Sequence, residues 1–215
     1  MGTLAQAKNL GGIGSILTLL AIVPYAGTVL AIVGWILVLI AIRYVSDVVQ
    51  DRSIFNNALI ATIVAIVGAA VGGAVIGLNV FHFYSAANVS SLNSTSSFTS
   101  PSPALTSLIT GVISGLVVIW ILAIVASYFL WRSYKTIAVK LNIGTFRTGG
   151  LLYLIGSCLD IILVGFILQF VAQILFVVAF FSIPEAPPPG STVFTPPPPA
   201  PSGPTTASVN LAKEA

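Results

Sequence analysis

One acidic residue lies inside an apolar segment of the chain, and it is the strongest candidate for chemistry. Asp160 is flanked by leucine and isoleucine residues. A carboxylate in hydrocarbon is costly, so intramembrane acids are functional candidates, above all as proton or cation sites. Asp160 also precedes Gly165 by five residues. At about 7 Å of helical rise, its carboxylate could instead reach an outer interface, and both interpretations stay open at this point.

Two glutamines follow Asp160 in the next apolar stretch. Gln169 and Gln173 are four residues apart and therefore share one face of a helix. Such polar side chains hydrogen-bond between membrane helices, with a gain of about 1 kcal/mol. We interpret the pair as a contact that holds helices together, in preference to the lining of a pore. With Asp160 they form the set of candidate intramembrane polar residues.

The remaining reactive residue types are too few to build an enzyme site. The chain has one histidine, one cysteine and five acids. His82 has no second histidine, cysteine or carboxylate near it in the sequence, and Cys158 alone forms neither an intramolecular disulfide nor a metal site. Catalytic triads, phosphate-binding glycine loops and metal-ligand spacings are missing from the sequence. We therefore expect no enzymatic activity, no cofactor and no metal. A net charge of +3 without a basic run predicts no nucleic-acid partner.

The elements that position these residues must lie in a lipid bilayer. The chain is 57% hydrophobic and only 6% charged, against about 25% charged residues in a typical soluble domain. A span needs about 20 apolar residues, and 56–81 and 105–131 each supply one. The segments 9–42 and 148–182 are too long for one span and short for two, and each has a break at its middle, at Pro24–Gly27 and at Val164–Gly165. Because proline disfavours a helix and glycine permits a reversal, each segment is predicted to be a helical hairpin.

The basic residues give the sidedness. All eight lie between or beyond the apolar runs: Lys8, Arg43, Arg52, Arg132, Lys135, Lys140, Arg147 and Lys213. By the positive-inside rule, both termini are cytoplasmic and the 79–104 loop is extracellular in a multi-pass protein of the cell membrane. The predicted fold is all-α, with a transmembrane domain over 1–183 whose six spans are 10–24, 27–43, 56–81, 105–131, 149–163 and 165–182. Four spans with two re-entrant hairpins are the alternative, with the same sidedness.

Two segments outside the spans carry their own signals. The 79–104 loop contains Asn88 and Asn93 in glycosylation triplets, which would require the extracellular face. Residues 184–215 form a tail that holds ten of the chain's 13 prolines. Such a sequence favours an extended polyproline conformation and cannot bury a core. We expect a disordered spacer, with a cytoplasmic protein partner as the alternative.

Glycines at a spacing of four mark the helix contacts. The third and fourth predicted spans carry Gly68, Gly72, Gly73, Gly77, Gly111 and Gly115. In lipid, glycine pairs at this spacing allow two helix backbones to approach closely. We expect these spans to pack tightly, either within one chain or across a homo-oligomer.

The two predicted hairpins resemble each other at an offset of 138 residues. Gly11 and Gly12 match Gly149 and Gly150, and Gly27 matches Gly165, which indicates an internal repeat. The chain also resembles an archaeal integral-membrane family catalogued as domain of unknown function 996. Four blocks carry this resemblance: AKNLGGIG at 7–14, IFNNAL at 54–59, TFRTGGL at 145–151 and VAFFSI at 178–183. The family implies a membrane protein and no activity, cofactor or site residue.

Two functions remain open from the sequence. The favoured one is a non-enzymatic structural, scaffold or assembly component of the membrane, with an interior closed by small residues. The alternative is a small transporter or channel that uses Asp160 with Gln169 and Gln173. The second predicts that polar side chains converge on a cavity at the middle of the membrane.

Overall fold

The computed structural model describes residues 3–90 and 103–185, and this part of the chain is helical without any strand. Its elements are α1 (Leu4–Leu19), η1 (Leu20–Ile22), α2 (Gly27–Val49), α3 (Arg52–Ser90), α4 (Pro103–Leu141), α5 (Gly144–Leu159), η2 (Asp160–Ile162) and α6 (Val164–Phe181). The prediction of an all-α fold is confirmed. Four of the helices, α2, α3, α4 and α6, are long and apolar enough to cross a membrane, whereas α1 and α5 have 16 residues each.

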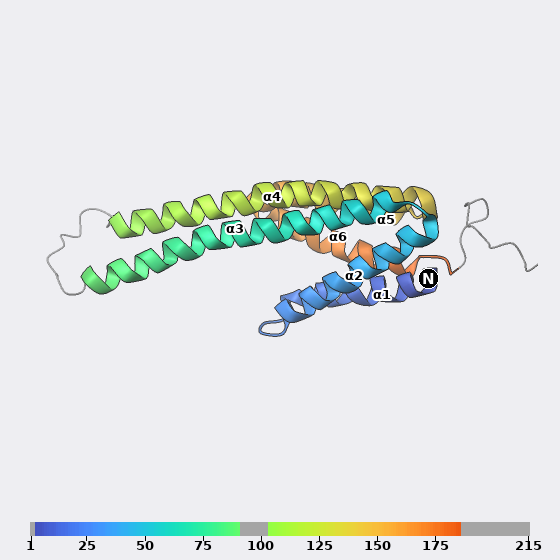
Figure 1. Cartoon of the computed structure of the whole chain (residues 1–215), viewed down its shortest axis with the longest axis horizontal. Coiled ribbons are helices and arrows are strands. Elements are labelled where there is room, and N and C mark those ends of the chain that lie inside the picture. The colour runs from blue at the N-terminus through green and yellow to red at the C-terminus, as the bar shows by residue number, and fades with distance from the viewer. Residues whose placement is uncertain (1–2, 91–102, 186–215) are drawn as a thin grey trace, which may run out of the picture.

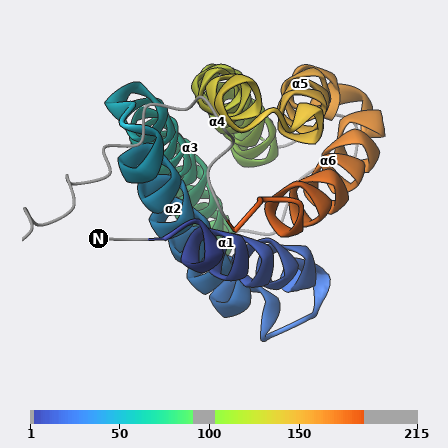
Figure 2. The same cartoon turned by 90° about the vertical axis from the view of Figure 1, so that its right-hand side faces the viewer.

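The six α-helices form a closed ring. Each packs against its neighbours in chain order, and α6 returns to pack against α1. The view along the bundle shows this ring with α1 and α6 side by side (Figure 2). The α3 and α4 helices extend well beyond the pairs α1–α2 and α5–α6 (Figure 1). The ring of six helices is therefore complete at one end, and only α3 and α4 continue toward the other.

The turns that join each short pair use left-handed residues other than glycine. Tyr25, between α1 and α2, has φ 67°, and Leu163, between α5 and α6, has φ 61°. The expectation that Gly27 and Gly165 make the reversals is wrong. Both glycines lie in the first turn of the returning helix. A Cβ would collide with Ala21 O of η1 at Gly27, and with Gly156 O of α5 and Asp160 N of η2 at Gly165. They are needed for close approach.

The buried core lies at the end of the ring where the chain starts, and every α-helix contributes to it. Its centre is a group of aromatic rings. The Tyr134 ring lies 4.4 Å from that of Phe176, and the Phe146 ring lies 5.0 Å from that of Phe180, measured between centroids. These four side chains are at most 3% exposed. Burial of this apolar surface holds all the helices together at this end.

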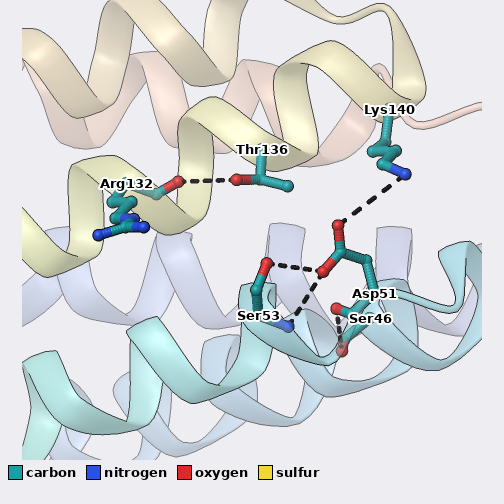
Figure 3. Close-up of polar contacts among 6 residues, drawn as sticks. All are labelled: Ser46, Asp51, Ser53, Arg132, Thr136 and Lys140. Carbon is teal, nitrogen blue, oxygen red and sulfur yellow. Dashed lines mark hydrogen bonds and ion pairs between the residues drawn. The ribbon is translucent and has the colours of Figure 1, made fainter.

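Most charged residues gather around the same end, which we call the basic end. Asp51 precedes α3, and its Oδ1 accepts hydrogen bonds from the Ser53 N–H and hydroxyl at 3.0 and 2.6 Å, which caps the helix. Its Oδ2 lies 3.9 Å from Lys140 Nζ of α4 (Figure 3). The Ser46 hydroxyl donates to the Asp51 carbonyl at 2.8 Å. The loop between α2 and α3 is thus fixed to the end of α4.

Candidate intramembrane site at Asp160

Asp160 begins η2, directly after α5, and its carboxylate faces α6. Oδ2 of Asp160 accepts a hydrogen bond of 2.7 Å from Nε2 of Gln169. Oδ1 is buried, has no hydrogen-bond partner in the described residues, and lies where a Cβ on Gly165 would be. Neither of the two ion pairs found in residues 3–90 and 103–185 includes Asp160. One carboxylate oxygen therefore has no partner among the described residues to compensate for its burial.

A chain of hydrogen bonds links Asp160 to two further helices. Nε2 of Gln169 also lies 3.4 Å from Oγ of Ser157 on α5, and that oxygen lies 2.6 Å from Oγ of Ser127 on α4. The indole N–H of Trp120 donates to the Ser157 carbonyl at 2.9 Å. The polar network thus runs from η2 through α6 and α5 to α4, and it fixes these elements relative to one another.

This network borders a cavity of about 150 Å³ inside the ring. Alanines of α3 and α4 line the apolar side of the cavity, which leaves space between the helices. Its polar and aromatic lining residues come from α2, α4, α5, η2 and α6, and they are Trp35, Ser127, Tyr153, Ser157, Asp160 and Gln169. The volume is enough for several water molecules or a small hydrated ion. Polar side chains from five elements therefore converge on one space.

The cavity lies deep between the ends of the bundle. Counting 1.5 Å per residue, Asp160 is about 20 Å from Arg147, and Ala123 is about 13 Å from Arg132. The apolar core of a bilayer is about 30 Å thick. Asp160 lines a groove together with Ile119 and Ala123, near the middle of α4, and its reach to an outer interface stays a prediction. Asp160 therefore lies well along the bundle from the basic residues at the start of α5 and after the middle of α4.

Two apolar grooves adjoin the site. One, of about 430 Å³, lies between α4 and the η2–α6 turn, and Asp160 is its only charged lining residue. The other, of about 440 Å³, lies between α1 and α5–α6, and it is lined by Thr18, Tyr153, Gln169 and Gln173 among apolar residues. Gln173 therefore borders the second groove and not the Asp160 cavity, whereas Gln169 borders both.

The glycines predicted to mediate packing divide into two groups. Gly68 and Gly72 of α3 face Leu122 and Ile119 of α4, and on α4 Gly115 faces Ile76 and Gly111 faces Asn79. A Cβ at Gly73 or Gly77 would meet nothing within 4 Å. The first group lies at the contact between α3 and α4, and the second lies on an open face of α3.

The other predicted sites fall outside or at the edge of the described residues. Asn88 is in the last turn of α3, and Asn93 and the tail from residue 186 lie beyond the part that the structure describes. Among the described residues no cluster of three or more His, Cys, Asp and Glu could hold a metal ion.

Sequence reasoning missed Ser127 and Ser157. Each is an isolated serine in an apolar segment, and the sequence analysis assigned no role to either. Their one available signal was position: Ser157 lies three residues before Asp160, on the same side of a helix. The pairing of Ser157 with Ser127 spans 30 residues and depends on how α4 meets α5, which the local pattern does not contain.

Comparison with known proteins identifies relatives. The model of the family described as "Protein of unknown function (DUF996)" matches residues 30–174. An uncharacterized protein of Methanocaldococcus jannaschii is 33% identical over 183 residues, which cover 85% of this chain and 94% of that protein. No solved structure matches the chain. With a match over most of its length, this chain belongs to the DUF996 family.

Proposed function

We propose that this protein is a small membrane transporter or channel in which Asp160 binds a proton or a monovalent cation. The observation that supports it best is the convergence of Asp160, Gln169, Ser157 and Ser127 on one cavity. A carboxylate in an apolar layer has a large desolvation penalty, and a bound proton or cation removes it. Of the residues that the transporter hypothesis named, Asp160 and Gln169 line this cavity and Gln173 does not, and we rank transport above a purely structural role on the first two.

The chemistry of the lining favours a single positive charge. Asp160 is the only acid that lines the cavity, and the serine hydroxyls offer neutral oxygens. Divalent cations in proteins usually take several carboxylates, whereas one carboxylate balances one proton or one monovalent ion. Gln169 donates to the carboxylate, which stabilises the charged form and keeps the site ready to bind.

The charged residues at the basic end support one arrangement of the protein in the membrane. These charges support a cytoplasmic position for this end and for both termini. We favour the re-entrant alternative, in which α3 and α4 cross completely and the pairs α1–α2 and α5–α6 are hairpins that enter from the cytoplasmic side.

The two hairpins also support an internal repeat, because Tyr25 and Leu163, the left-handed residues of their turns, are separated by the same 138 residues as Gly27 and Gly165. Ile22 takes the place of Asp160 in the first hairpin, so the polar chemistry belongs to the second.

The test is flux through the purified full chain in liposomes. An internal pH-sensitive dye reports proton entry, and a potassium or sodium gradient is applied in separate runs. We expect Asp160→Asn to lower the protein-dependent flux at least tenfold. Asp47→Asn is the matched control, because Asp47 is an exposed acid at the basic end and its loss should change nothing. Equal flux for the wild type and Asp160→Asn, or for protein and empty liposomes, contradicts the proposal.

A scaffold or assembly role is the second candidate, and one contact favours it. Lys8 Nζ lies 3.7 Å from Oε1 of Glu185, so the segment that leads into the proline-rich tail starts beside α1 at the basic end. The tail would then be presented on the cytoplasmic face to a protein partner. Affinity purification of the full chain and of a chain ending at Glu185, which keeps the buried Ile183, tests this role. A stoichiometric partner lost with the tail supports it.

A further inference from the structure

The groove between α4 and the η2–α6 turn joins a lipid-facing surface to the Asp160 carboxylate. Its walls include Leu116, Val117 and Phe166, which are 53%, 42% and 61% exposed, respectively. Asp160 lines both this groove and the polar cavity. A molecule in the groove would therefore contact lipid-like side chains along its length and a carboxylate at its inner end.

We propose that this groove binds an amphipathic organic cation, with its positive group at Asp160 and its apolar part between α4 and α6. The inference rests on the function proposed above and names its substrate class. Three observations carry it: the groove holds about 430 Å³, its only charged lining residue is acidic, and Asp160 has no cationic partner in the described residues.

Charge complementarity decides between classes of occupant. A neutral lipid chain would fill the apolar walls and leave the Asp160 carboxylate without a counter-charge among the described residues, which is unfavourable in an apolar groove. An anion would be repelled by Asp160. A cation with an apolar body can pair its charge with Asp160 and pack its apolar part against the apolar walls of the groove. Because the walls are exposed on the surface of the bundle, such a molecule can enter laterally from the bilayer.

The experiment measures binding of labelled tetraphenylphosphonium to the full chain in nanodiscs of uncharged phosphatidylcholine, after subtraction of empty discs. Binding should be saturable and displaced by dodecylammonium, but not by dodecanol. Asp160→Asn should weaken it at least tenfold. Val117→Trp, which fills the groove from the lipid side, should weaken it similarly. Ile121→Trp is the matched control, because Ile121 is a 50% exposed residue of α4 that does not line the groove, and it should bind as the wild type does.

Unchanged binding in Asp160→Asn or Val117→Trp, or equal displacement by dodecanol, would overturn the inference. Its failure is distinct from failure of the proposed function. If protons or alkali cations move in an Asp160-dependent way while tetraphenylphosphonium does not bind, the transporter stands and the substrate class is wrong. If neither flux nor binding depends on Asp160, both are wrong.

Discussion

Nε2 of Gln169 lies 2.7 Å from Oδ2 of Asp160, so that an amide of α6 holds the carboxylate that ends α5. The contact ties the two arms of the second helix pair together across their turn. It also orients the carboxylate beside a cavity whose polar walls come from several helices.

Gln169→Leu should strengthen proton binding at Asp160 while the bundle stays folded, because the Gln169 amide donates to the charged carboxylate and stabilises it. The substitution removes the donor to Oδ2 and keeps a similar volume. One intramembrane hydrogen bond contributes about 1 kcal/mol, so we expect the affinity of Asp160 for a proton to rise about fivefold. Gln173→Leu is the control, since Gln173 borders only the second groove. Equal effects of the two substitutions in a cation-binding titration would argue against the role given to Gln169.

Gly72→Ile should disrupt the contact between α3 and α4. A Cβ at Gly72 would collide with Ile119 and with the Gly115 backbone, whereas a Cβ at Gly73 would meet nothing. Overpacking at such a site costs about 1–3 kcal/mol. We expect a lower midpoint of thermal unfolding in detergent for Gly72→Ile and an unchanged one for Gly73→Ile.

The same pair of variants distinguishes packing within one chain from association between chains. A loss of oligomeric size in Gly73→Ile, with stability unchanged, would assign Gly73 and Gly77 to a contact with a second copy. Equal stability of Gly72→Ile and the wild type would contradict the packing described here.

Much of this arrangement follows from sequence, and the limits of such prediction have physical causes. The helical class follows from hydropathy, and the cost of a charge in lipid singles out Asp160 as a candidate. The spacing of small residues predicts the glycines at the contact between α3 and α4, which are Gly68, Gly72, Gly111 and Gly115. The sequence does not predict that Gly73 and Gly77 lie on an open face of α3. Two overlapping glycine pairs on one helix do not specify which pair faces the neighbouring helix. The Ser127–Ser157 contact and the cavity depend on how distant helices meet, which periodicity within one helix does not specify.

Asp51→Ala should destabilise the protein more than Lys140→Ala does. Asp51 caps α3 through Ser53 and also pairs with Lys140. Loss of a helix cap costs about 1 kcal/mol, whereas the pair is partly exposed at a distance of 3.9 Å and contributes about 0–1 kcal/mol. Thermal unfolding of both variants checks the order. A larger loss for Lys140→Ala would show that the ion pair, and not the cap, fixes the α2–α3 loop.

The depth of the second hairpin is open to chemical labelling. In a Cys158→Ser background, Leu163→Cys should resist a membrane-impermeant maleimide added outside, because the η2 turn lies beside the middle of α4. Ser85→Cys, at an exposed position in the last two turns of α3, should react. Equal labelling of both positions would mean that the hairpin crosses completely, as in the six-span arrangement.

The central claim is that the Asp160 carboxylate binds a cation or a proton inside the bundle, and infrared difference spectroscopy tests it most directly. The wild type and Asp160→Asn, each in nanodiscs, are titrated with protons, sodium, potassium and tetraphenylphosphonium. The account predicts a carboxyl band that is present in the wild type, missing in Asp160→Asn and shifted by at least one of these ligands. A band that none of them shifts would show that Asp160 binds no cation, and the proposed function would be wrong.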